Sequence, residues 1–348
     1  MAEARDLLTT LLRDVSRSFY LSLWLLPSAV RRPIALGYLL ARATDTIADT
    51  TLLPVSRRLA ALGTLRGRIQ GEIQQVVDLS EWAVDQNADA TAGERVLLAR
   101  VEEAVTVLGT LEASDRGRVR SVLATITSGQ ELDLQRFDGA SRQHVIALPD
   151  AASLDDYTHR VAGCVGDFWT RVCRAHLFPD ASLDEAALLE DGVRFGKGLQ
   201  LVNILRDLPR DLAQGRCYLP EDELRAVGLK ASDLLEPSNE SRLAPVYGRW
   251  LERAEGHLSA GWRYTTTLPR SQVRVRLACA LPVLIGVADA GGPSQGRRAG
   301  SRPADQGQPR RGPGHLVALH RPPALGSWVE RAGGLGTDSW LRRGRAGS

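Results

Sequence analysis

The sequence predicts an all-α protein, and two observations support this prediction. Apolar residues recur at helical spacing along most of the chain, up to about residue 287. Capping-box patterns stand at the start of two long periodic stretches, at Ser153–Asp156 and at Ser182–Glu185. We therefore expect one helical domain over residues 1–288.

The composition limits the class of protein. The chain has 348 residues, and 43% of them are hydrophobic, which is enough for a substantial core. Its formal net charge is only +3 and it has no basic, aromatic-interleaved element, so nucleic acid is not an expected partner. The N-terminus lacks an apolar signal core, and the longest apolar runs fall short of the roughly 20 residues that span a bilayer. We expect no transmembrane segment.

The four cysteines, like the six histidines, do not fall at zinc-ligand spacings, and no C-x-x-C motif is present. We predict that they are buried thiols in a reducing, cytoplasmic compartment. They are Cys164, Cys173, Cys217 and Cys279.

The first half of the chain divides into successive helices. They are expected over residues 3–15, in the stretch that follows Pro33, and over residues 55–77, 93–112 and about 114–134. Ser80–Gly93 is polar and predicts a loop. The last of these helices ends with Glu131 and Asp133, which we expect to be solvated.

The second half opens with a turn-rich connection, Asp138–Asp150, followed by a long helix through Gly163 and Gly166. Glycine inside a helix costs about 0.5–1 kcal/mol relative to alanine, so this pair indicates either close helix packing or room for a ligand. Pro209 should end or kink the next helix. Two more helices are expected over residues 241–267 and 271–287.

The composition changes after the last of these helices. Gly, Pro and Arg make up about half of the residues from Gly291 onward, without a sustained apolar period. Such a segment cannot repay the entropy of ordering. We predict that residues 289–348 form a disordered tail.

One predicted helix carries polar ligand groups at regular spacing. Asn203, Asp207 and Asp211 recur every four residues, which places them on one helical face. They either share a cation or form a solvated stripe in which Arg206 and Arg210 pair with the aspartates.

A second stretch has the same character. Tyr38, Arg42, Asp45 and Asp49 also share one helical face. Carboxylates from two helices suit Mg²⁺, which prefers oxygen ligands and usually binds one or two carboxylates together with substrate phosphates. A diphosphate is therefore the expected ligand.

Four segments carry a resemblance to a known family. They are SRSFYLSLWLLP (Ser16–Pro27), YLLARATDTIAD (Tyr38–Asp49), YTHRVAGCVGDF (Tyr157–Phe168) and NILRDLPRDLAQGRCYLP (Asn203–Pro220). In these segments the chain resembles the squalene and phytoene synthases, the head-to-head branch of the isoprenyl diphosphate synthases. The resemblance implies an isoprenoid-synthase-type helical bundle around a central cavity. The segment from residue 291 departs from the family, whose members continue with apolar helical sequence.

The resemblance also implies roles for individual residues. It assigns Asp45, Asp49, Asn203, Asp207 and Asp211 to Mg²⁺ and diphosphate, Ser18, Arg42, Lys197, Arg206 and Arg216 to the substrate diphosphate, and Tyr38, Tyr157 and Tyr218 to the reacting centre. The implied reaction joins two farnesyl diphosphates through presqualene diphosphate to squalene, with NADPH as reductant. The implied enzyme is cytoplasmic, with peripheral membrane contact for product release.

Two positions bear on the choice of product. Asp45–Ile47 looks like the squalene-type pattern, whereas Arg160 stands where the family often has tyrosine. No G-x-G-x-x-G motif follows a strand, which is also true of the family's squalene synthases. The alternatives are a phytoene or dehydrosqualene synthase that needs no nicotinamide, and a non-catalytic helical scaffold of the same fold.

Overall fold

A computed structural model describes residues 6–16, 19–84, 87 and 89–291, and it confirms the all-α prediction. The α-helices are α2 (Leu12–Ser16), α3 (Tyr20–Leu25), α4 (Ser28–Asp49), α5 (Val55–Gln70), α6 (Ala92–Ala99), α7 (Val101–Gly109), α8 (Ala113–Arg136), α9 (Ala151–Thr158), α10 (Cys164–Leu177), α11 (Glu185–Ala213), α12 (Glu221–Ala226), α13 (Glu240–Thr267) and α14 (Val273–Gly291). Short π- or 3₁₀-helical turns are η1 (Leu7–Leu11), η3 (His159–Gly163), η4 (Ala231–Leu235) and η5 (Pro237–Asn239). Two strands, β1 (Ile146–Leu148) and β2 (Arg216–Pro220), pair in parallel.

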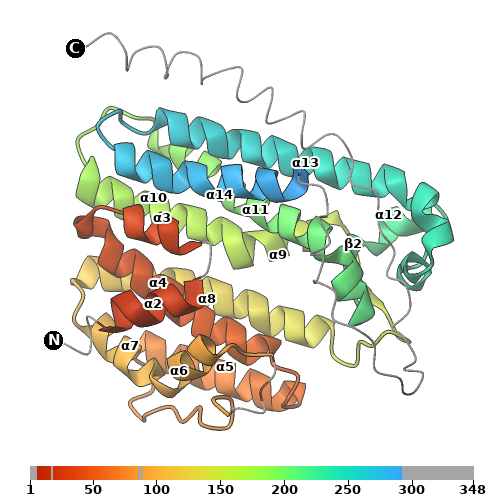
Figure 1. Cartoon of the computed structure of the whole chain (residues 1–348), viewed down its shortest axis with the longest axis horizontal. Helices are drawn as coiled ribbons and strands as arrows, with labels where there is room; N and C mark the ends of the chain where they lie inside the picture. Colours follow the sequence, from red (N-terminus) through yellow and green to blue (C-terminus); the bar gives the residue numbers. More distant parts are fainter. Residues whose placement is uncertain (1–5, 17–18, 85–86, 88, 292–348) are drawn as a thin grey trace, which may run out of the picture.

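The long helices lie in two groups (Figure 1). Helices α4 to α8 form one group, and α9 to α14 form the other. Helix α8 packs against both α4 and α10, and α11 packs against α10 and α13. One apolar cluster runs across both groups, while a second surrounds β2 and the facing halves of α11 and α13. The packing therefore brings α4, α8 and α11 together around β2.

Glycines allow α10 and α11 to approach closely. A Cβ at Gly166 would overlap the backbone carbonyl of Gly192, and one at Gly196 would overlap that of Ala162. Of the two alternatives that the sequence leaves open at Gly166, the structure therefore supports close helix packing. The segment of Gly163 is the π-helical turn η3, which joins α9 and α10 without a break. Such turns are frequent at functional sites.

The predicted caps are displaced by a few residues. The N-caps of α9 and α11 are Asp150, which accepts a hydrogen bond from the backbone N–H of Ser153, and Asp184, which accepts one from Ala187. Asp150 precedes the predicted pattern and Asp184 lies within it. An aspartate side chain at the N-cap pairs an N–H that the helix leaves free.

Pro209 does not end its helix, which leaves a kink as the other predicted effect of this residue. Helix α11 continues to Ala213, and Leu208 and Leu212 on either side of the proline are buried. A proline inside a helix costs about 3 kcal/mol, but burying two leucines contributes a similar amount in the other direction.

Other boundaries also differ from the predictions. The helix predicted over 55–77 ends at Gln70, because Gly71 adopts a left-handed conformation with φ 83°. The helix predicted over 93–112 is interrupted at Arg100. The connection Asp138–Asp150 contains β1, which was not predicted because three residues become a strand only by pairing with β2.

The four cysteines are free and buried, as predicted. The tail over residues 289–348 lies outside the described residues from Gly292 onward, while α14 extends to Gly291. Within the described part of the chain, no helix has the length and apolar character needed to cross a bilayer.

Candidate active site

A pocket of about 320 Å³ lies where α4, α8, η3, α11 and β2 meet. Its polar lining comes mainly from α4 and β2. Its apolar wall is formed by Ile126 of α8, Val161 of η3 and Val165 of α10. The pocket therefore places charged groups beside an apolar surface.

Helix α4 presents a cation and two carboxylates to this pocket, as the sequence predicts. The Nη1 atom of Arg42 lies 2.5 Å from Oδ2 of Asp45, one helical turn away. Its Nε atom donates to Oε1 of Glu94 at 2.9 Å. Glu94 begins α6 and also completes a capping box with Thr91. Two elements thus hold the Arg42 guanidinium in position.

The carboxylates of α4 resist ionisation. Burial raises the pKa of Asp45 to about 7, the nearby Asp49 carboxylate adds to the rise, and Arg42 opposes it. Burial also raises the pKa of Asp49, although Arg216 and Arg42 oppose this. Glu94 behaves differently, because hydrogen bonds from Thr91 and Arg42 outweigh its burial and lower its pKa. Negative charge on α4 is therefore poorly compensated at Asp45 and Asp49.

Arg216 of β2 lies among carboxylates from three helices. It is close enough to Asp49 of α4, Asp133 of α8 and Asp211 of α11 to oppose the rise in the pKa of each. Its Nη1 atom lies 3.7 Å from Oδ2 of Asp133. This side chain is half-buried and connects the two predicted aspartate helices.

Two tyrosines and Asp133 form a contact chain at the pocket wall. The hydroxyl of Tyr218 donates to Oδ2 of Asp133 at 2.9 Å, and the hydroxyl of Tyr157 lies 3.5 Å from that of Tyr218. The two rings stack with centroids 4.8 Å apart. Burial raises the pKa of Asp133 to about 6. It also raises the pKa of both phenols, which therefore stay protonated.

The prediction that Asp133 is solvated is wrong. Its side chain is 13% exposed, and its Oδ1 atom is buried without a hydrogen-bond partner among the described residues. Oε1 of Gln130, one turn earlier on α8, is also buried without a hydrogen-bond partner among the described residues. Both residues line the pocket. Glu131 pairs instead with Arg66 at 2.7 Å.

Helix α11 holds its aspartates less firmly. Asp207 pairs with its neighbour Arg206, with Nε to Oδ1 at 2.8 Å, and 37% of the Asp207 side chain is exposed. Burial and then the charge of Asp207 raise the pKa of Asp211 to about 7. Asn203 is half-buried one turn before Asp207. In the described chain, no three His, Cys, Asp or Glu side chains converge on one metal position.

Other predicted site residues are placed differently. Tyr38 lines the pocket, and its hydroxyl donates to the carbonyl of Val15 at 3.2 Å. Lys197 is directed to Asp155, with Nζ to Oδ2 at 2.8 Å, and is not brought to the pocket. Ser18 lies outside the described residues.

Arg160, the residue that departs from the family pattern, contacts residues outside the candidate pocket. Its Nε atom donates to Asp156 at 2.9 Å, and its Nη1 atom donates to Ser128 at 3.0 Å. It does not line the pocket of the aspartates.

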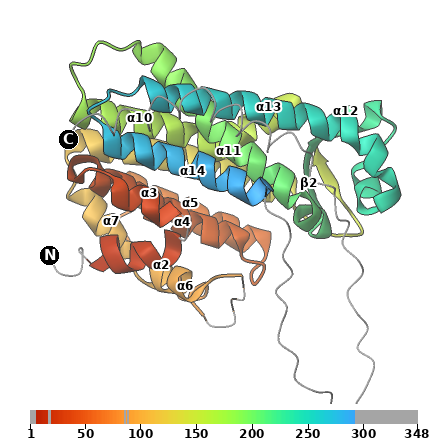
Figure 2. The same ribbon diagram turned by 45° about the horizontal axis from the view of Figure 1, so that its top comes forward.

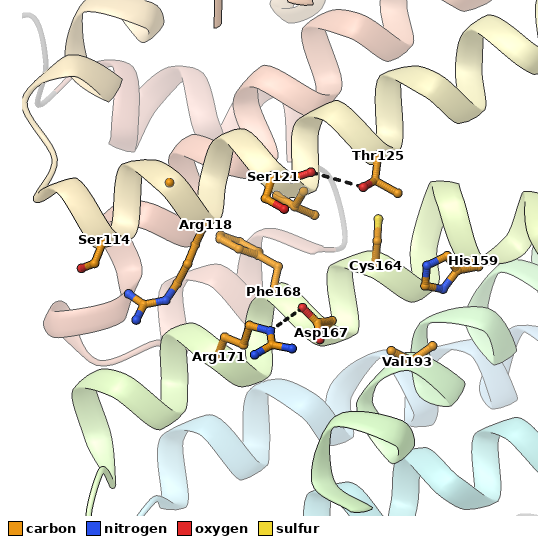
Figure 3. Close-up of a pocket in the computed structure, with 12 residues that line it drawn as sticks. Ser114, Arg118, Ser121, Thr125, His159, Cys164, Asp167, Phe168, Arg171 and Val193 are labelled. Carbon is orange, nitrogen blue, oxygen red and sulfur yellow. Dashed lines mark hydrogen bonds and ion pairs between the residues drawn. The ribbon is translucent and has the colours of Figure 1, made fainter. Parts of the chain in front are cut away.

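A second hollow, of about 580 Å³, lies between α8, α10 and α11 (Figure 3). It is larger than the first, but its charged residues are already paired. Arg171 donates to Asp167 at 2.8 Å, and Arg118 donates to Asp115 at 2.7 Å. Burial raises the pKa of the Cys164 thiol at its edge to about 12, so that thiol is unreactive. The smaller pocket is therefore the candidate active site.

Sequence reasoning missed three contributors to this pocket: Glu94, Gln130 and Asp133. A signal was available for Glu94, because Thr91 and Glu94 form a capping-box pattern. For Asp133 the only signal was an acidic residue near the end of a helix with apolar periodicity. Neither the capping-box pattern nor this acidic residue indicates which distant helix or strand packs against the side chain.

Comparisons with known proteins identify the family of the chain. The family model described as squalene/phytoene synthase matches residues 12–290. A presqualene diphosphate synthase from Rhodopseudomonas palustris is 30% identical over 257 residues, which cover 74% of this chain and 77% of that protein. A squalene synthase from Eremothecium gossypii is 27% identical over 280 residues, which cover 80% of this chain and 59% of that protein.

A solved structure also shares the fold. The crystal structure of squalene synthase HpnC from Alicyclobacillus acidocaldarius superposes with a TM-score of 0.58 at 18% identity, covering 83% of this chain and 93% of that one. The family match extends over most of the chain and includes every element that lines the candidate pocket. The chain belongs to the squalene/phytoene synthase family.

Proposed function

We propose that the protein joins two farnesyl diphosphates head to head, forms presqualene diphosphate, and reduces it to squalene with NADPH. The observation that carries the proposal is Arg216, which lines the pocket together with carboxylates of α4 and α8. Asp211 of α11 does not line this pocket, but it lies near enough for Arg216 to oppose the rise in its pKa. Cations and carboxylates from both halves of the fold suit a diphosphate and its counter-ion. The apolar wall beside them suits a prenyl chain.

The arginines supply the direct contacts to diphosphate in this proposal. Arg42 and Arg216 line the pocket, and their guanidinium N–H groups would donate charge-assisted hydrogen bonds to the substrate oxygens. Arg206 would contact phosphate from the rim after leaving Asp207. Lys197 is a weaker candidate, because Asp155 already holds its ammonium group. Ser18 keeps its predicted role as a phosphate contact.

The residues present fit Mg²⁺. Burial and a neighbouring carboxylate raise the pKa values of Asp45 and Asp211 despite nearby arginines, and all of the proposed ligands are oxygen donors. Since no three carboxylates converge in the described chain, substrate phosphates would complete the coordination. The proposed ligands are Asp45, Asp49, Asn203, Asp207 and Asp211. Bound Mg²⁺ would neutralise charge on the departing diphosphate.

The tyrosines provide a route for the proton that is lost when the cyclopropane ring closes. Tyr157 and Tyr218 are neutral phenols in contact, and Tyr218 donates to Asp133. With a pKa of about 6, Asp133 is largely ionised at neutral pH and can receive a proton through Tyr218. Tyr38 would line the reacting centre. The apolar wall would exclude water from the cation.

A second candidate is release of presqualene diphosphate without reduction. It is favoured by the relative from Rhodopseudomonas palustris, which is named a presqualene diphosphate synthase. NADPH is carried by the sequence resemblance alone, and no residue is assigned to it. Phytoene or dehydrosqualene formation stays a further alternative, and the scaffold alternative is disfavoured because both aspartate pairs are present.

One experiment separates these products. Purified protein is incubated with Mg²⁺ and either farnesyl or geranylgeranyl diphosphate, with and without NADPH, and products are identified by mass. We expect presqualene diphosphate from farnesyl diphosphate alone and squalene when NADPH is added. Presqualene diphosphate under both conditions would support the second candidate. Phytoene from geranylgeranyl diphosphate without NADPH would overturn the farnesyl assignment.

A further inference from the structure

Helix α8 carries an amide in a row of apolar residues. Ile126, Gln130 and Leu134 are four residues apart on this helix, and all three line the candidate pocket. The period calls for an apolar residue at the middle position, yet Gln130 occupies it and is only 8% exposed. Its Oε1 atom is buried without a hydrogen-bond partner among the described residues. The apolar wall of the pocket therefore contains an unpaired amide oxygen.

This amide lowers the stability of the folded protein. A buried polar atom without a partner loses its hydrogen bonds to water and gains none in return. A methionine or leucine would fill similar space without that loss. Positions where a chain departs from the pattern that its fold favours are expected at functional sites. The unpaired oxygen of Gln130 therefore points to a ligand that enters the pocket.

The position of Gln130 indicates which part of a substrate it faces. Arg42 of α4 and Arg216 of β2 line the same pocket, and α8 packs against α4. Figures 1 and 2 show α4 and α11 in separate layers of the bundle, with β2 beside α11. A diphosphate held by the two arginines would thus lie between the layers. The prenyl chain attached to it would lie against the apolar wall that contains Gln130.

Ionisation of the substrate creates positive charge between these two regions. The C1–O bond breaks, its electron pair leaves with the diphosphate, and the prenyl C1 becomes cationic. We propose that Gln130 is a catalytic residue whose amide oxygen stabilises this prenyl cation, an inference that rests on the proposed function. The oxygen is the negative end of the amide dipole, and its attraction to a cation is strong in an apolar environment. Gln130 forms no covalent bond and takes no proton, so its role differs from that of Asp133.

Replacing the amide by an apolar side chain of similar length tests the proposal. Gln130→Met should lower kcat about 10- to 100-fold and leave KM within about threefold, because the substrate carries no positive charge at C1 before ionisation. The Tm should stay equal or rise, because an unpaired buried oxygen is removed. The rate is measured as diphosphate release from whichever of farnesyl and geranylgeranyl diphosphate the wild type consumes.

Two control variants separate burial from position. Thr127 of α8 is fully buried, its Oγ1 atom also lacks a partner in the part of the chain that the structure describes, and it does not line the pocket. Thr127→Val should resemble Gln130→Met in Tm but keep kcat within about twofold. Gln70 donates to the backbone carbonyl of Arg120 at 2.9 Å. Gln70→Met should lower the Tm and keep kcat within about twofold.

A binding measurement tests the same inference without turnover. Farnesylamine carries an ammonium group at C1 and imitates the cation, whereas farnesol is its neutral counterpart. Calorimetric titration with each is performed in the presence of Mg²⁺ and pyrophosphate. Gln130→Met should weaken the binding of farnesylamine about tenfold and change the affinity for farnesol less than about twofold.

The other outcomes overturn the proposal. Wild-type kcat in Gln130→Met, or equal loss of affinity for farnesylamine and farnesol, would show that the amide does not act on positive charge. A lower Tm with kcat and KM impaired together would make Gln130 a structural residue. If the wild type consumes neither diphosphate but farnesylamine binding depends on Gln130, the cation contact stands and only the proposed function fails.

Discussion

The aspartates of α4 and α11 have the same spacing along their helices but different surroundings. On α4, Arg42 contacts Asp45 and is held from the other side by Glu94 of α6. On α11, Asp207 pairs with the adjacent Arg206, and more than a third of its side chain is exposed. The charged side chains of α4 are therefore held by a contact from a second helix, α6, whereas Asp207 of α11 is held by a neighbour on its own helix.

This difference indicates a division of labour within one site. Arg42 and Asp45 of α4 are held in position in the absence of ligand, because the buried carboxylate of Glu94 forms an ion pair with Arg42. The α11 group can exchange its Arg206 contact for substrate or cation at little cost, because exposed ion pairs contribute only about 0–1 kcal/mol. Similar sequence patterns therefore need not behave alike.

The largest expected effect is on catalysis, and it should be common to both helices. Asp45→Asn and Asp207→Asn should each lower kcat/KM at least about a thousandfold, because each removes a proposed cation ligand. Both should keep the wild-type circular dichroism spectrum. Asp167→Asn, in the second hollow, is the matched control and should stay within about threefold. A variant that keeps most of the wild-type rate at saturating Mg²⁺ would remove that residue from the site.

The second effect should separate the two helices. Glu94→Gln leaves Arg42 without its buried anion and should lower the free energy of unfolding by about 2–4 kcal/mol, together with kcat. Arg206→Gln breaks the exposed pair of α11 and should cost less than about 1 kcal/mol. Urea unfolding measures both. Equal losses would mean that the contrast between the helices is incorrect.

A third prediction concerns pH. The folded pKa of Asp133, about 6, lies above its ordinary value of 3.8, so the folded state binds the proton more tightly than the unfolded chain. The protonated Asp133 carboxyl therefore contributes fully to the free energy of unfolding below about pH 4, and this contribution is lost as pH rises through 6. In the wild type the free energy of unfolding should fall by at most roughly 3 kcal/mol between pH 4 and 7 on this account, and Asp133→Asn should remove that fall, as measured by urea unfolding. An unchanged slope in this variant would contradict the buried position of Asp133.

The smallest expected effect is on thermal stability. Mg²⁺ with pyrophosphate should raise the Tm by a few degrees, because ligands that bind only the folded state stabilise it by mass action. The rise should disappear in Asp45→Asn. No shift in the wild type with both ligands present would count against the whole cation site.

Much of the site was predictable because its residues recur at helical spacing. Tyr38, Arg42, Asp45 and Asp49 fall on one face of α4 and all line the pocket. Lys197 was predicted for the diphosphate by position, yet it pairs with Asp155 of α9. Local spacing specifies which face a side chain is on, but the partner on that face comes from a distant segment.

The sequence alone determined the helical class and the two aspartate faces, because each depends on residues within a few turns of one helix. At Gly166 it left close packing and room for a ligand as alternatives, because the choice depends on the neighbouring helix α11. Tertiary structure decided the rest. Glu94 belongs to the site because α6 packs against α4, where it contacts Arg42, and Asp133 belongs to it because β2 packs beside α8, where Tyr218 donates to it. Burial at those contacts sets their charge, since a carboxylate removed from water is governed by the partner it finds there.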